Sequence, residues 1–96
     1  MVRHIVMWKL KEENKAENAR LLKEKLEGLA GIIPEIVELH VGLNINPDES
    51  SFDAVLNSVF NSFDDLKKYQ ANPKHVAVSD FCKGIRLERA VVDHEF

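Results

Sequence analysis

The sequence lacks the features that mark several large classes of protein. Its 96 residues include one cysteine, Cys82, so no disulfide can form within the chain. A lone thiol is typical of a reducing compartment, and we expect a cytoplasmic protein. No apolar run approaches the roughly 20 residues that a membrane-spanning helix needs. The first residues also lack the apolar core and cleavage site of a signal peptide, so we expect no membrane as a partner.

Basic residues are also fewer than acidic residues. The chain carries 13 Lys and Arg against 16 Asp and Glu, a net charge of −3, and the two signs are interspersed. Nucleic-acid-binding domains concentrate basic residues on one face, so we expect no nucleic-acid partner. The histidines lack the close spacing of a zinc site, and we assign no metal and no cofactor. They are His4, His40, His75 and His94.

The length allows one domain, which we expect to span residues 1–96. A chain of this size buries about 65% of the surface that its unfolded form exposes. Its core is therefore small, and further apolar burial through self-association would stabilise it.

Apolar periodicity predicts the order of the elements. A helix is expected over 12–29, ended by Gly31, and a second helix begins at Ser62, with Asp65 completing a capping box. Strands are expected over 3–10, 35–45, 52–60 and 85–96. This β-α-β-β-α-β order predicts an α+β, ferredoxin-like fold. Both helices should cover one face of a four-stranded antiparallel sheet.

The second strand predicts how the chain associates. Its strongly apolar face comprises Val37, Leu39, Val41, Leu43 and Ile45. We place this face on the open side of the sheet, with Ile5 and Met7 of the first strand. A patch of this size is not left in water, and a second copy of the sheet would cover it. We therefore predict a homodimeric α+β barrel, and we expect Val41→Asp to split the dimer.

The segment Tyr69–Val78, YQANPKHVAV, combines a helix break with titratable side chains. Asn72 is a good N-cap and Pro73 is favoured just after it, so a short helix should begin here with His75 in its first turn. The positive end of a helix disfavours imidazolium, which predicts that His75 is neutral near pH 7. A neutral ring can act as a base, and the Tyr69 phenol can donate a hydrogen bond to a ligand oxygen.

A histidine on the first strand extends this candidate site. His4 shares the helix-covered face with Val6 and Trp8, and polar tips that converge on an apolar cavity are typical of ligand sites. A purely structural role is the alternative for each polar group. His75 would then bond a backbone carbonyl, Tyr69 would fill the core, and His4 would pair with a neighbouring strand.

Three stretches of the chain resemble the stress-responsive A/B barrel domain family, often called Dabb. They are HIVMWKL at His4–Leu10, VVDHEF at Val91–Phe96, and the segment Phe52–Val78, which contains Y-x-x-x-P-x-H. The resemblance covers nearly the whole chain and implies a dimeric α+β barrel. Family members include plant stress-induced proteins, small bacterial proteins of unknown role and a plant polyketide cyclase, so a stress-response role is implied as well.

The cyclase supplies a chemical template. It closes a linear polyketide thioester by an intramolecular aldol reaction, with a histidine as base and a tyrosine assisting it. On the matching positions, the resemblance implies catalytic roles for His75 as base and Tyr69 as its orienting or polarising partner. A ligand would then contact residues of the same pocket, namely His4, Val6, Trp8, Leu22, Leu26 and Leu56.

The chain departs from the cyclase in two places. Its first helix presents Leu22, Lys23 and Leu26 where the cyclase has aromatic side chains. Its last strand carries Arg86 and Arg89 where the cyclase is largely apolar. These differences predict a smaller or more polar pocket and a different substrate. In some plant members, backbone carbonyls after the first helix hold an ion, and the matching segment AGIIPEI has no side-chain signature that decides the point.

Three functions therefore stay open. We favour a small dimeric barrel that binds a carbonyl-containing or aromatic metabolite. The second is an acid–base cyclase or lyase that uses His75 and Tyr69, which leaves open whether the protein is an enzyme. The third is a purely structural or assembly dimer. All three stay open because a shared fold does not determine function.

Overall fold

One antiparallel sheet organises the molecule. The computed structural model describes residues 1–96. The elements are β1 (Val2–Leu10), α1 (Lys15–Glu27), β2 (Glu38–Leu43), β3 (Ala54–Phe60), α2 (Phe63–Ala71), α3 (Pro73–Ile85) and β4 (Arg86–Glu95). The strand order is β2-β3-β1-β4, and every neighbouring pair is antiparallel. This arrangement confirms the predicted ferredoxin-like α+β fold.

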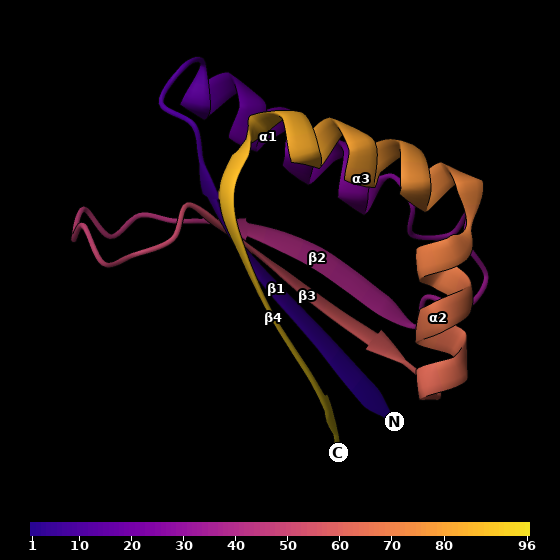
Figure 1. The fold of residues 1–96 in the computed structure, drawn as a ribbon. Coiled ribbons are helices and arrows are strands. Elements are labelled where there is room, and N and C mark those ends of the chain that lie inside the picture. Colours follow the sequence, from indigo (N-terminus) through magenta and orange to yellow (C-terminus); the bar gives the residue numbers. More distant parts are fainter.

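The helices lie together on one side of the sheet. Figure 1 shows α1 and α3 side by side above the strands, with α2 at one end and the opposite face uncovered. The helices and the covered face of the sheet share one apolar core, in which Val6, Leu22, Phe60 and Leu66 are almost completely buried. The longest helices, α1 and α3, have 13 residues each, too short and too polar to cross a bilayer.

The helix ends follow local capping chemistry, with some differences from the predicted bounds. Ser62 and Asn72 cap α2 and α3 as predicted, accepting hydrogen bonds from the amides of Asp65 at 3.1 Å and Lys74 at 2.9 Å. Helix α1 is shorter than the predicted 12–29, since its N-cap is Asn14 and its C-cap is Gly28. Gly31 was therefore wrong as the helix end.

The predicted strands and the predicted short helix also change in length. Helix α3 begins at Pro73 as predicted, but it is longer than the predicted short helix and continues to Ile85. Asn72 separates it from α2. The strands predicted over 35–45 and 52–60 shorten to β2 and β3, because the turns around Pro34 and Asp48 take their outer residues.

The predicted placement of Val41 on the open face is wrong. Val41 lies opposite Leu56, which lies opposite Val6, and all three are buried under the helices. Alternation separates the two faces of a strand but does not say which face the helices cover. The open face instead exposes apolar side chains of β1 and β4, with Met7 40% and Val92 60% exposed.

Candidate functional site

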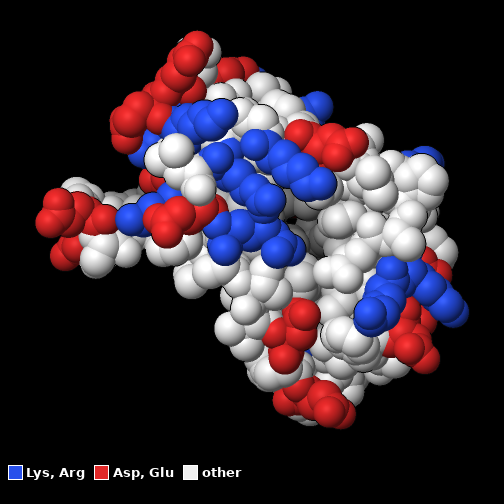
Figure 2. Space-filling model, in the orientation of Figure 1, with Lys and Arg blue, Asp and Glu red and all other residues white.

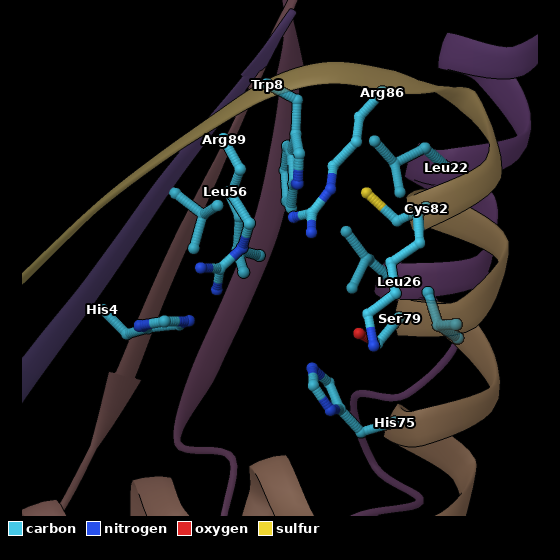
Figure 3. Close-up of a pocket in the computed structure, with 13 residues that line it drawn as sticks. His4, Trp8, Leu22, Leu26, Leu56, His75, Ser79, Cys82, Arg86 and Arg89 are labelled. Carbon is cyan, nitrogen blue, oxygen red and sulfur yellow. The ribbon is translucent and has the colours of Figure 1, made fainter. Parts of the chain in front are cut away.

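A cavity of about 210 Å³ lies between the sheet and the helices α1 and α3. Figure 3 shows its labelled side chains converging from strands on one side and helices on the other. The wall contains all six residues predicted to contact a ligand: His4, Val6, Trp8, Leu22, Leu26 and Leu56. Helix α3 and strand β4 complete it with His75, Val78, Ser79, Cys82, Lys83, Arg86 and Arg89.

His75 lies in the first turn of α3, where the Asn72 cap and Pro73 place it. Its Nδ1 lies 3.1 Å from the carbonyl oxygen of Gln70. Because a carbonyl only accepts, Nδ1 is the donor, and in the neutral ring the free lone pair is on Nε2. Burial lowers the pKa of His75 below the ordinary 6.5, the Gln70 contact opposes this shift, and His4 and Arg89 add to it. The ring is therefore neutral near pH 7.

Tyr69 lies behind this wall rather than in it. The side chain is 0% exposed, and its ring centroid is 4.4 Å from that of His75 and 6.4 Å from that of His4. Its hydroxyl has no hydrogen-bond partner, and burial raises the pKa of Tyr69 well above its usual range, so the phenol stays protonated. The structure thus shows a ring contact with His75 and no hydrogen bond between them.

His4 is buried and pairs with a more exposed aspartate on the neighbouring strand. It lies opposite Asp93 in the register of β1 and β4, and its Nδ1 donates to Asp93 Oδ1 at 2.5 Å. Asp93 belongs to the VVDHEF stretch, but residue spacing alone gave it no role. The two residues are 89 positions apart in the sequence, and only the pairing of β1 with β4 brings their side chains together.

A bulge in β4 directs two arginines into the cavity. Arg86 and Arg89 are three residues apart, and in a regular strand they would point to opposite faces. The register changes, however: Arg89 lies opposite Trp8, Glu88 opposite Lys9, and Arg86 opposite Leu10, so Leu87 is the extra residue. Bulges re-aim side chains in this way. No alternation pattern reveals such a pair.

The structural alternatives predicted for these residues are also visible. His75 bonds a carbonyl, Tyr69 fills the core, and His4 pairs with a neighbouring strand. Each group is thus held in place, while His4 and His75 also border the cavity. The catalytic roles of His75 and Tyr69 stay predictions. No three His, Cys, Asp or Glu side chains lie close enough together to hold a metal ion.

Solved structures share this architecture. A dimeric protein of unknown function with a ferredoxin-like fold from Bacteroides fragilis is 38% identical, with a TM-score of 0.92 and coverage of 99% of this chain and 95% of that chain. The hydroxynitrile lyase from Passiflora edulis is 21% identical, with a TM-score of 0.85 and coverage of 97% and 90%. At that identity, the likeness to the lyase shows the fold alone.

Sequence comparison gives the family. The uncharacterized protein SCO4036 from Streptomyces coelicolor is 29% identical over 103 residues, which covers 100% of both chains. The model of the stress responsive A/B barrel domain, Dabb, matches residues 2–96. The predicted resemblance is therefore confirmed, and the chain belongs to the stress-responsive A/B barrel domain family.

Proposed function

We propose that the chain forms a homodimeric α+β barrel that binds a small carbonyl-containing or aromatic metabolite between the sheet and the helices. The cavity is the observation that carries this proposal, because it combines an apolar wall with the polar tips of His4 and His75. Its volume of about 210 Å³ lies below the roughly 300–1,000 Å³ of pockets for drug-sized ligands, so the ligand is small. A role in stress response is supported by the family name.

The open face of the sheet supports the dimer. It exposes Met7 and Val92, and a second sheet would cover them. The relative from Bacteroides fragilis, at 38% identity, is described as dimeric.

Acid–base chemistry is the second candidate function, favoured by the Nδ1 contact of His75. That contact leaves Nε2 as the acceptor, so the ring can remove a proton alpha to a ligand carbonyl. Tyr69 lies behind the wall, and its ring, whose centroid is 4.4 Å from that of His75, would orient this base. A hydroxynitrile lyase with this fold is an example of a lyase on the same scaffold.

The chain offers a reporter for the binding test, since Trp8 is its single tryptophan and lines the cavity. Phenylacetone and phenylacetamide should change Trp8 fluorescence and the NMR signals of the His75 ring, because both rings border the same space. Leu26→Phe would fill part of that space without adding a second tryptophan and should weaken both responses. If neither compound changes either signal, the binding proposal is wrong.

Catalysis needs a separate measurement. Exchange of the alpha protons of phenylacetone in D₂O should be faster with the protein than without it, and His75→Gln should remove the acceleration. Gln keeps a polar group but cannot act as the base. A His75→Gln protein that still binds but no longer exchanges protons supports the enzyme. Equal exchange by both proteins leaves the binding function and removes the catalytic one.

A further inference from the structure

The four arginines of the chain divide into two kinds. Arg20 forms ion pairs with two glutamates of α1, and Arg3 donates a hydrogen bond to Asn57 Oδ1 at 3.3 Å. Arg86 and Arg89 have neither an ion pair nor a side-chain hydrogen bond with the rest of the protein, and both line the cavity. Figure 3 shows both guanidinium groups directed into it.

Positive charge gathers at this cavity although the whole chain is acidic. Figure 2 shows Lys and Arg side chains grouped beside a hollow in the surface. Lys83 adds a third cation to the wall, and its nearest carboxylate, that of Asp80, is 4.0 Å from Nζ. Burial raises the pKa of the Cys82 thiol in the wall, and the charges of Arg86 and Arg89 act in the opposite direction. The cavity therefore has a local field that favours anions.

The hydrogen-bonding groups of the wall are mostly donors. Guanidinium groups only donate, and so does the Trp8 Nε1–H, which is buried and has no partner. The Asp93 carboxylate accepts from His4. A ligand that satisfies Arg86, Arg89 and Trp8 together must bring several acceptor atoms. An oxyanion does so, and arginine binds carboxylates with two parallel hydrogen bonds.

The apolar residues of the wall limit the kind of anion. Leu22, Leu26 and Leu56 present apolar surface to the same space. An inorganic ion would leave that surface in contact with water, whereas an organic acid would cover it with its own apolar part. The volume of about 210 Å³ admits only a small one.

We infer that the ligand of this cavity is a small organic acid. Its carboxylate binds Arg86 and Arg89 at the β4 side, and its apolar part lies against Leu22, Leu26 and Leu56. This inference rests on the proposed function and narrows its ligand class from carbonyl or aromatic compounds to carboxylic acids. The β4 bulge is the structural device that permits it, because it brings both arginines to one face.

The test compares an acid with its neutral amide. Phenylacetate and phenylacetamide have nearly the same shape, and Trp8 fluorescence measures the affinity of both. Phenylacetate should bind at least about tenfold more tightly, as expected for charge-assisted hydrogen bonds. Arg89→Gln and Arg86→Gln should each weaken the binding of phenylacetate about ten- to hundredfold and leave the affinity for phenylacetamide unchanged. Added salt should weaken the binding of the acid and not that of the amide.

Controls separate the possible failures. Arg20→Gln removes the same charge outside the cavity and should change neither affinity, and circular dichroism checks that each variant is folded. Equal binding of acid and amide, or an undiminished acid affinity in both arginine variants, overturns the inference while the proposed function stands. Tighter binding of inorganic phosphate than of phenylacetate overturns the assignment of a carboxylic acid as the ligand class. Binding of neither organic compound contradicts the proposed function and this inference together.

Discussion

His75 is a residue whose protonation is set by its surroundings. Its position could be predicted, because an Asn-Pro start fixes a helix locally. The main cause of its lowered pKa could not be predicted, because that cause is burial, which is a property of the folded chain. The Asp93 partner of His4 also depends on how distant segments of the chain meet. Gln70, by contrast, lies only five residues before His75. The predicted residues His4 and His75 thus lie in the cavity wall, and Tyr69 lies behind it.

The lowered pKa of His75 predicts a pH dependence of stability. The unfolded state keeps the ordinary value of 6.5, so between the two pKa values it binds more protons than the folded state. Stability should therefore fall as the pH drops from 6.5 towards the lower pKa of the folded protein. NMR titration of the His75 ring should give a midpoint below 6.5. Denaturant unfolding at pH about 5.5 and 7.5 should show a smaller loss for His75→Gln than for the wild type. A midpoint at or above 6.5 contradicts the assigned environment.

The Tyr69 hydroxyl predicts an unusual mutational result. A buried hydroxyl without a partner costs about 1–3 kcal/mol, so Tyr69→Phe should leave the free energy of unfolding unchanged or raise it by about 1 kcal/mol. The hydroxyl lies behind the cavity wall, so the same variant should leave the affinity for phenylacetate unchanged. Denaturant unfolding and a phenylacetate titration measure the two quantities. A loss of more than about 1 kcal/mol would show that the hydroxyl has a stabilising partner.

At the scale of elements, periodicity predicted the strands and helices but not their orientation. The alternation of β2 was predicted correctly, yet Val41 faces the helices. Alternation separates the two faces of a strand but does not indicate which of them the helices cover. The bulge at Leu87 could not be predicted from the sequence either. It depends on how β4 pairs with β1, and the spacing of three residues between Arg86 and Arg89 would place them on opposite faces of a regular strand.

The cap of α3 links an element to the site. Asn72→Ala removes the hydrogen bond to the Lys74 amide and should lower the free energy of unfolding by about 1 kcal/mol. It should also shift the ring signals of His75, which lies in the turn that the cap fixes. Ser62→Ala is the matched control, since it removes the cap of α2 at similar cost and should leave those signals in place. Equal shifts in both variants would contradict the link.

At the scale of the whole molecule, the two faces of the sheet predict opposite outcomes for the same substitution. Met7→Asp changes an exposed side chain, so the protein should stay folded and become monomeric. Val41→Asp puts a charge at a position that is 2% exposed and should cost on the order of 3–5 kcal/mol, a large part of the stability of a small domain. Light scattering and circular dichroism distinguish the two. A folded, dimeric Met7→Asp protein would exclude this face as the interface.

The contact between Gln70 and His75 has a consequence for how such a protein can evolve. The carbonyl belongs to α2 and the ring to α3, so the direction of Nε2 follows the angle between the two helices. Residues that seat α2 on the sheet, such as the buried Leu66, can change that angle without touching the cavity wall. Substitutions under α2 can therefore change the direction of the histidine Nε2 separately from the shape of the pocket. The orientation of the ring can then evolve while the affinity for an existing ligand is kept.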